Sequence, residues 1–401
     1  MDQMESLTTL MSLQNLAAAI VVYFGSFTFY RLFLHPLSRF PGPELAAITK
    51  YYEAYYDIVQ DGQYTFRIAE MHIEHGTGQI VNLGAAPSAF TRDVSTEFIL
   101  GKSYNSLDEE DFDIGMTSVF QGSGHIWRIT KHITWFAPTM KSIPVDWVMK
   151  VADDGTKAFF RYLKETTHDT KEFLAAIALS DPDDKAPHNI VHEILDSNLP
   201  AEDKKFERVF DDVATVTGAG FKTTASVLRL IIFHVFNSPE ILKRLLKTLE
   251  QLPYLTSILM EGMRLSPAIA SRSARISPDG DLTCGKWRIP SGTPIGMTTL
   301  LMHTDEKLYP DPIQFKPGRW MDIDARRKHD KIYAAFSKKT RICLGMNLAG
   351  AEMYMLLATL VQRFDFHFEG VTSEDFECES DQFIIGTSGK GVLNAFATSY
   401  K

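Results

Sequence analysis

Cysteine is scarce in this chain, with three cysteines among 401 residues, Cys284, Cys343 and Cys378. They are far apart and odd in number, which argues against a disulfide framework and against a zinc site of paired cysteines. The formal net charge is −9, whereas a nucleic-acid-binding protein usually has a basic excess. The chain also has no Walker-type glycine loop and no Gly-x-Ser-x-Gly elbow. A nucleic-acid binder, a phosphate-loop enzyme and a serine hydrolase of that type are therefore disfavoured.

Charge is absent from one segment near the N-terminus, Ser6–Tyr30, which is almost wholly apolar from Leu16 onward. A membrane-spanning helix needs about 20 such residues. Acidic residues precede this segment and basic residues follow it, so the positive-inside rule places the bulk of the protein in the cytoplasm. We expect residues 1–31 to be a single-pass membrane anchor.

A stiff connector follows the anchor, because residues 32–43 end in Phe40-Pro41-Gly42-Pro43, where two prolines flank a glycine. Residues 44–401 form the main domain, which the hydrophobic pattern predicts to be mainly α-helical with small β-sheets. Its expected helices are Glu44–Ile58, Val213–Phe236, Leu252–Leu265 and Leu344–Phe364. Its expected strands are Trp287–Pro290, Thr293–Met297 and pieces of Phe383–Ala397.

The strongest chemical signal lies around Cys343, which stands just before an expected helix. Free N–H groups and the macrodipole at a helix start stabilise a thiolate, and a thiolate is a ligand of haem iron. Gly345 lets the helix start pass close to a flat cofactor. Arg341 can pair with a haem propionate, and Phe336 can pack against the ring and shield the sulfur. We therefore expect Cys343 to be the metal ligand and the other three residues to bind the cofactor.

This segment resembles the haem-binding signature of the cytochrome P-450 family, in which Phe, Gly, Arg, Cys and Gly occur at fixed spacings. Phe336, Arg341, Cys343 and Gly345 match, but Lys339 stands where the family has its first glycine. Left-handed backbone angles are expected at that turn, and a lysine there would cost roughly 1–2 kcal/mol.

The resemblance extends to a buried network of one glutamate and two arginines, for which Glu261, Arg264 and Arg319 have the matching positions. Glu261 and Arg264 are three residues apart and share one helix face. A carboxylate flanked by two guanidinium groups is compensated and rigid, so its role is structural. Arg275 falls where the family places another propionate partner.

The long apolar helix contains a second match, Ala219, Gly220 and Thr223, in the order of the family's oxygen-activation motif. We expect the small residues to make room for a ligand, and Thr223 to donate a hydrogen bond to bound dioxygen and to help relay protons. The motif's acidic residue is missing, and Lys222 replaces it.

One family element is not found in the sequence, the helix whose Trp or His and Arg grip the haem propionates. The chain is shortened between Gly76 and Phe98, and again between Phe236 and Glu261. The resemblance therefore implies an incomplete cytochrome P-450 fold that lacks part of the substrate pocket and one haem wall.

Two functions remain open. The resemblance implies a haem b monooxygenase that takes electrons from NADPH-cytochrome P-450 reductase at the endoplasmic reticulum membrane. It would insert oxygen into an apolar substrate. Short segments of the sequence are similar to fungal members of the family related to trichodiene oxygenase, which implies a terpenoid or other secondary metabolite as the substrate. The second is a degenerate, membrane-tethered relative with weak or no haem binding, which Lys222, Lys339 and the missing wall favour.

Nine Lys or Arg against three Asp from Lys316 to Arg341 indicate a basic docking face for an acidic redox partner.

Overall fold

The computed structural model describes residues 13–35, 79–122, 124–143, 147, 149–150, 154–179, 189–249 and 252–399. These residues are mainly helical with three small sheets, as the sequence predicts. The chain divides into two units, residues 1–80 with 396–398 and the remainder. The expected helix Glu44–Ile58 and residues 36–43 of the expected connector lie outside the described residues. The longer helices are α6 (Ala86–Leu100), α11 (Asp154–Leu179), α13 (Phe206–Phe236), α14 (Pro239–Thr248), α15 (Pro253–Leu265), α17 (Ile323–Ile332) and α18 (Met346–Arg363).

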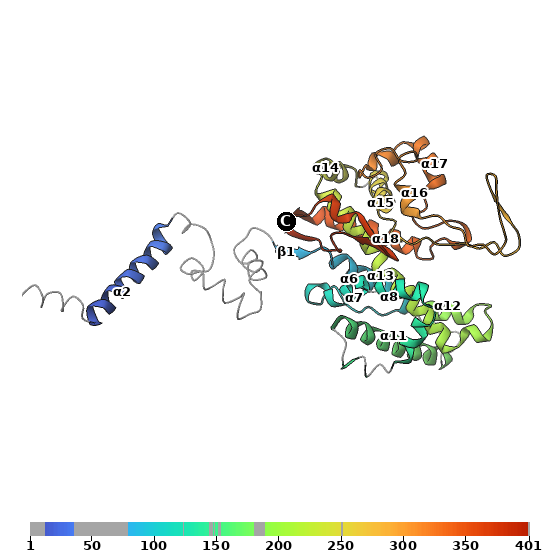
Figure 1. Ribbon diagram of the computed structural model, residues 1–401, viewed down its shortest axis with the longest axis horizontal. Coiled ribbons are helices and arrows are strands. Elements are labelled where there is room, and N and C mark those ends of the chain that lie inside the picture. Colours follow the sequence, from blue (N-terminus) through green and yellow to red (C-terminus); the bar gives the residue numbers. More distant parts are fainter. Residues whose placement is uncertain are drawn as a thin grey trace, which may run out of the picture. The chain divides into compact units, whose positions relative to one another are not determined.

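Helix α13 runs through the middle of the larger unit, with α11 and α12 (Ile190–Asp196) on one side and α15, α16 (Thr299–His303) and α17 on the other (Figure 1). Its second half is buried on nearly every face, which explains the almost uninterrupted apolar run in that part of the sequence. Arg229 is the buried exception, because its guanidinium donates to the Gly84 carbonyl at 3.0 Å and to Ser88 Oγ at 3.2 Å.

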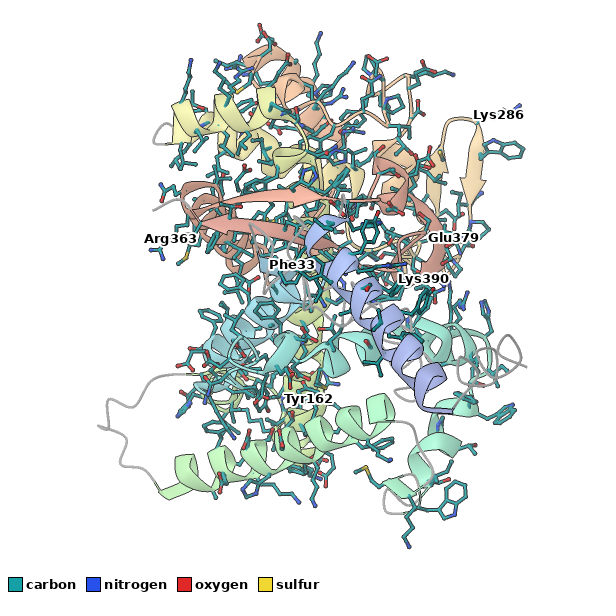
Figure 2. All side chains as sticks on the ribbon, turned by 90° about the vertical axis from the view of Figure 1, so that its left-hand side faces the viewer. Phe33, Tyr162, Lys286, Arg363, Glu379 and Lys390 are labelled. Atoms are coloured by element: carbon teal, nitrogen blue, oxygen red, sulfur yellow. The ribbon has the colours of Figure 1, made fainter. Side chains whose placement is uncertain are left out.

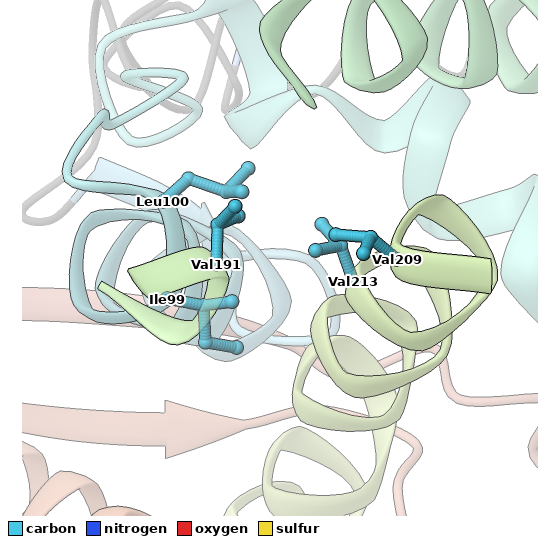
Figure 3. Packing of buried hydrophobic residues seen from close by; sticks show 5 residues of the cluster. All are labelled: Ile99, Leu100, Val191, Val209 and Val213. Atoms are coloured by element: carbon cyan, nitrogen blue, oxygen red, sulfur yellow. The ribbon is translucent and has the colours of Figure 1, made fainter. Parts of the chain in front are cut away.

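The first half of α13 packs against a small apolar cluster. Val209 and Val213 of α13 face Ile99 and Leu100 at the end of α6 and Val191 of α12 (Figure 3). All five side chains are nearly inaccessible to water, so burial of their apolar area fixes both helices against α13.

Helix α11 is joined to α13 by a buried polar contact as well as by packing. Tyr162 is a residue of α11 (Figure 2). Its hydroxyl lies 2.9 Å from Thr217 Oγ1, and its ring packs edge-on against Phe221. A buried tyrosine hydroxyl needs such a partner, so the register between α11 and α13 is specified by this pair.

Glu261, Arg264 and Arg319 contact one another as the sequence predicts, and Glu261 and Arg264 are fully buried. Glu261 accepts two hydrogen bonds from Arg264, both at 2.9 Å, and one from Arg319 Nε at 3.0 Å. Trp320 Nε1 and the Lys316 backbone N–H also donate to it, each at 2.8 Å. Every lone pair of this carboxylate is therefore engaged, which is what a buried charge requires.

The sheets are small and lie beside the helices. Strands β1 (Gln79–Asn82), β7 (Asn394–Ser399) and β4 (Phe364–Phe368) form one sheet in the order β1-β7-β4. Strand β2 (Leu282–Cys284) pairs antiparallel with β3 (Trp287–Ile289), with Cys284 opposite Trp287. Strand β5 (Cys378–Gln382) pairs antiparallel with β6 (Ile384–Thr387), with Gln382 opposite Ile384. The predicted strand Thr293–Met297 is reduced to a single bridge between Arg275 and Ile295, because no partner continues the ladder.

Apolar helix α2 (Leu13–Phe29) occupies part of the segment predicted to cross a membrane, and a short π-helical stretch, Tyr30–Leu34, continues it. Among the described residues the helix long and apolar enough to span a bilayer is α13, and 67% of its most apolar part is buried inside the protein. α13 is therefore the core helix of the domain, and the N-terminal anchor stays a prediction.

Replacing Glu261 with glutamine tests whether this network holds the fold. The change leaves two buried guanidinium groups without their negative partner, so we expect Glu261→Gln to lower the free energy of unfolding by about 3–5 kcal/mol. Urea denaturation measures this. The exposed Glu240 at the start of α14 provides the matched control, and Glu240→Gln should change stability by less than about 0.5 kcal/mol. Equal effects of the two variants would contradict the structural role.

Candidate haem-thiolate site

The loop that carries Cys343 is closed by its own backbone. The Cys343 N–H donates to the Phe336 carbonyl at 2.8 Å, which brings the two ends of the motif together. Gly345 then caps α18, which begins at Met346, and a Cβ added to Gly345 would meet nothing within 4 Å. The cysteine side chain is exposed on this loop at the start of a long helix. The geometry suits a thiolate offered to a ligand above the loop.

Backbone strain is present at the position where the sequence departs from the family pattern. Lys339 has φ +62°, the left-handed conformation expected there, and Ser337 has the same value. Lys339 begins a short 3-10 turn, Lys339–Arg341, in which the Ile342 N–H donates to the Lys339 carbonyl at 3.1 Å. The lysine therefore adopts the turn that glycine would adopt without strain.

The surface around Cys343 combines exposed apolar and cationic side chains. Leu344 is 82% exposed and Ile342 47% exposed, a large apolar area beside one thiol. Arg341 and Arg275 are exposed at its border, and Arg275 Nη2 reaches Ser337 Oγ of the same loop at 3.4 Å. An apolar platform with a thiol at its centre and guanidinium groups at its edge fits a flat apolar macrocycle that carries carboxylates.

The predicted oxygen-activation residues lie on α13 with different surroundings. Ala219 is exposed and Thr223 partly exposed, and Thr223 Oγ1 donates to the Ala219 carbonyl at 3.0 Å. Gly220 instead faces α6, where an added Cβ would come within 2.3 Å of Ser95 Oγ. The space that Gly220 leaves is therefore taken up by helix packing rather than by a ligand, which corrects the expected role of this glycine.

Lys222 is partly buried beside these residues, where the family motif has an acid. Burial, and to a smaller extent the positive charge of Arg229, lowers the pKa of Lys222 to about 8. The ammonium group remains mostly protonated at pH 7, so it can donate hydrogen bonds but cannot accept them.

A link between the buried network and the thiolate loop was missed in the sequence. His303 is fully buried at the end of α16, with Nδ1 3.2 Å from the Arg264 carbonyl, and its Nε2 accepts the Ala334 N–H at 3.1 Å. Burial lowers the pKa of His303 to about 4, so the imidazole is neutral and holds one tautomer. Its ring stacks on Tyr333 with centroids 5.2 Å apart. His303 thereby connects the glutamate–arginine network to the segment that leads into the loop.

A further buried acid, Glu352, is also absent from the sequence-based site. It lies on α18, and burial raises its pKa to about 7, while the hydroxyls of Thr224 and Ser95 oppose that rise. An acid nine residues after the cysteine, in a largely apolar helix, was the signal available in the sequence.

Trp127 and Lys131 have a spacing that suits a propionate-binding helix, but their contacts lie elsewhere. They belong to α8 (Gly124–His132), where the Trp127 ring packs against Phe383 with centroids 5.1 Å apart. The Lys131 ammonium lies 4.8 Å above the Trp127 ring. The two residues therefore do not take the place of the wall that the sequence lacks.

Of the nine basic residues predicted to form a docking face, Lys316 pairs with Asp311 and Arg319 with the buried Glu261. The other seven are exposed on α17 and on the thiolate loop, and they are Arg326, Arg327, Lys328, Lys331, Lys338, Lys339 and Arg341. Arg327 is engaged with Asp324 at 3.6 Å, a weak and fully accessible pair, so the surface keeps a net positive charge.

Known structures define the class to which this fold belongs. A cyanobacterial cytochrome P450, CYP120A1 with bound retinoic acid, superposes with a TM-score of 0.59 at 20% identity, over 88% of this chain and 77% of that one. CYP102L1 has the same TM-score at 17% identity, over 88% and 75% of the two chains. The fold is therefore that of the haem-thiolate cytochromes.

Sequence comparisons give the family. The model named Cytochrome P450 matches residues 65–393, so the chain belongs to the cytochrome P450 family. A cytochrome P450 monooxygenase of Ascocoryne sarcoides is 28% identical, over 92% of this chain and 95% of the relative. Cytochrome P450 monooxygenase TRI4 of Fusarium sporotrichioides is 27% identical over 90% of each chain. Such relatives make the protein an oxidoreductase of the monooxygenase class.

The same comparisons bear on the shortened regions. The alignment with the Ascocoryne sarcoides protein extends over 489 positions, 88 more than the 401 residues of this chain. At least that many positions of the alignment therefore have no counterpart here, which agrees with the missing segments inferred from the sequence.

Replacing Lys339 with glycine tests the strain in the thiolate loop. Glycine accepts φ +62° freely but loses more chain entropy on folding, so we expect Lys339→Gly to raise the free energy of unfolding by about 0.5–1 kcal/mol. The neighbouring Lys338 has φ −144°, and Lys338→Gly should lower it by about 0.5–1 kcal/mol. Urea denaturation distinguishes the two, and a loss of stability in both variants would show that Lys339 is not strained.

Proposed function

We propose that this protein is a membrane-anchored haem monooxygenase in which Cys343 supplies the iron ligand. The observation that carries the proposal is the closed loop from Phe336 to Cys343, which offers an exposed thiol at the start of α18 between apolar and cationic side chains. When bound, haem b would supply the oxygen chemistry, and a thiolate ligand favours cleavage of the O–O bond.

The protein's own residues would orient the cofactor and shield it from water. Arg275 and Arg341 would neutralise the propionates, while Ile342 and Leu344 would cover the ring and remove their apolar area from water. Thr223, on the opposite helix, would hold a hydrogen bond at the oxygen-binding side. The buried carboxylate of Glu261 would keep the loop in place through Arg264 and His303.

The substrate would be an apolar organic molecule, and relatives support a secondary metabolite. Similar proteins include the N-acetyltryptophan 6-hydroxylase of Emericella nidulans, 27% identical over 88% of this chain and 90% of the relative. Electrons would come from NADPH through a separate reductase that docks on the basic surface of α17 and the thiolate loop. The apolar helix α2 would anchor the protein in the endoplasmic reticulum membrane, with the catalytic domain in the cytoplasm.

A second function has specific observations in its favour. Lys222 replaces an acid, Lys339 occupies a strained turn, and at least 88 aligned positions of a relative have no counterpart. These departures favour a membrane-tethered relative that binds haem weakly or not at all.

The carbon-monoxide difference spectrum of the reduced protein decides between the two functions. A thiolate-type Soret band should be present in the full chain and absent from Cys343→Ala, because no other exposed thiol stands at the start of a helix. Cys378→Ala is the matched control and should keep the band. An unchanged spectrum in Cys343→Ala would refute the assignment of the ligand, and a chain without bound haem would favour the degenerate relative.

Lys222 should limit the use of electrons in any preparation that binds haem. A glutamate at this position accepts hydrogen bonds and would be attracted by Arg229, whereas the lysine is repelled by it. We expect Lys222→Glu to raise the ratio of oxidised product, or of water, to released peroxide at equal haem content. Lys222→Met, which removes the charge without adding an acceptor, serves as the control. Equal ratios in all three proteins would show that Lys222 is not the limiting feature.

A further inference from the structure

Three helices from distant parts of the chain meet at a small polar cluster inside the apolar core. Ser95 comes from α6, Thr224 from α13 and Glu352 from α18, and their side chains are almost completely buried. Both α6 and α18 pack on α13 and on each other. Gly220, one turn before Thr224, permits the close approach, because a Cβ there would collide with Ser95 Oγ. The absence of a side chain at residue 220 thus leaves room for a hydroxyl that faces the carboxyl group.

The carboxyl group of Glu352 has hydroxyl neighbours but no cation. Within the described part of the chain, burial raises the pKa of Glu352 and the hydroxyls of Thr224 and Ser95 lower it, and no charged side chain shifts it. Lys222, the partly buried cation of α13, does not influence the pKa of Glu352, and four buried or largely buried arginines bind other groups. Arg229 binds Gly84 and Ser88, Arg92 binds Asp113, and Arg264 and Arg319 bind Glu261.

Buried charge without a counter-ion is unstable, so a carboxyl group in this position is favoured in its neutral form. Glu352 Oε1 and Ser95 Oγ are both buried without a hydrogen bond of ordinary geometry. A neutral acid has one O–H donor and a hydroxyl has donor and acceptor capacity, so a small rotation would join the two atoms. An ionised carboxylate can only accept from the two hydroxyls, and those hydrogen bonds offset only part of the cost of burying its charge, because burial is the larger influence on the pKa.

We propose that Glu352 is a positioning residue that ties the helix carrying Thr223 to the helix that begins at the thiolate loop, acting as a neutral acid shared between Ser95 and Thr224. Thr224 is the chain neighbour of Thr223, and α18 starts three residues after Cys343. The separation between the two faces of the proposed haem site therefore depends on this crossing. The roles of Thr223 and Cys343 in haem binding rest on the proposed function, whereas the contact between the helices at Glu352 does not.

The protonation state of Glu352 makes the crossing sensitive to pH. Its pKa is about 7 in the folded protein and about 4.5 in the unfolded chain. Between these values the folded state binds more protons, so stability falls as pH rises through this window and levels off above it. At its steepest, linkage of one proton changes the ratio of folded to unfolded molecules about tenfold per pH unit. The crossing is thus tightest in mildly acidic solution and weaker above pH 7.

Glutamine at position 352 isolates this effect, because it keeps the shape and a hydrogen-bond donor but cannot ionise. The free energy of unfolding in urea is measured at pH 5, 6, 7 and 8 for the full wild-type chain and for Glu352→Gln. We expect the two proteins to have similar stability at pH 5, and the variant to become steadily more stable than the wild type up to pH 7–8. The exposed Glu369 provides the control, since Glu369→Gln should follow the wild type at every pH.

Hydrogen exchange locates the change. At pH 8 the amides of residues 217–227 and 349–357 should exchange several-fold faster in the wild type than in Glu352→Gln, and at equal rates at pH 5. Thr224→Val, which removes a partner hydroxyl, should speed exchange in the same segments. A stability difference that does not vary with pH, or faster exchange in Glu352→Gln at all pH values, would overturn the proposal. Haem content, read from the spectrum of the same samples, reports separately on the proposed function, because the pH dependence does not require bound haem.

Discussion

The buried carboxylate of Glu261 is the constraint on which the thiolate side of the protein depends. A fully buried anion is tolerated only because two guanidinium groups, an indole N–H and a backbone N–H all donate to it. Those donors come from α15 and from the segment 316–320, so satisfying one charge joins the two. His303 extends the connection to Ala334, from which the chain enters the thiolate loop. The buried network is thus connected by hydrogen bonds to the segment that leads to Cys343.

The opposite side of the site is governed by helix packing rather than by charge. The second half of helix α13 is packed against neighbours on nearly every face, and Gly220 leaves room for Ser95 of α6. The same crowding desolvates Lys222 and Arg229, whose pKa values fall to about 8 and about 10 because burial disfavours their charge. A lysine in place of an acid therefore changes the electrostatics of this helix more than it would at the surface.

The sequence predicted what short, fixed spacings encode. Cys343, Arg341 and Gly345 lie in one loop, Glu261 and Arg264 on one helix turn, and the long apolar runs became α13, α15 and α18 with ends within a few residues of those expected for the last two. The predicted strand Thr293–Met297 failed, because pairing depends on a distant partner. Glu352 was missed for the same reason. Its significance comes from Ser95 and Thr224, which are 257 and 128 residues away in sequence, and no local sequence pattern predicts a contact between such distant residues.

Two properties are distinct in this chain, the folding of the helices that hold the cysteine loop and the retention of haem. The helices that hold the cysteine loop, α13, α15 and α18 with α6 packed beside them, are linked by buried contacts among themselves. Within the described residues these contacts join the four helices directly, so the packing around the cysteine loop does not depend on the propionate-binding helix that was not found in the sequence. Haem affinity, however, depends on burying the macrocycle from both sides, because apolar area left in water contributes nothing. The family fold and a ready thiol therefore do not by themselves guarantee a retained cofactor. The strength of haem binding then depends on how far Arg275, Arg341, Ile342 and Leu344 can hold the ring from the thiolate side.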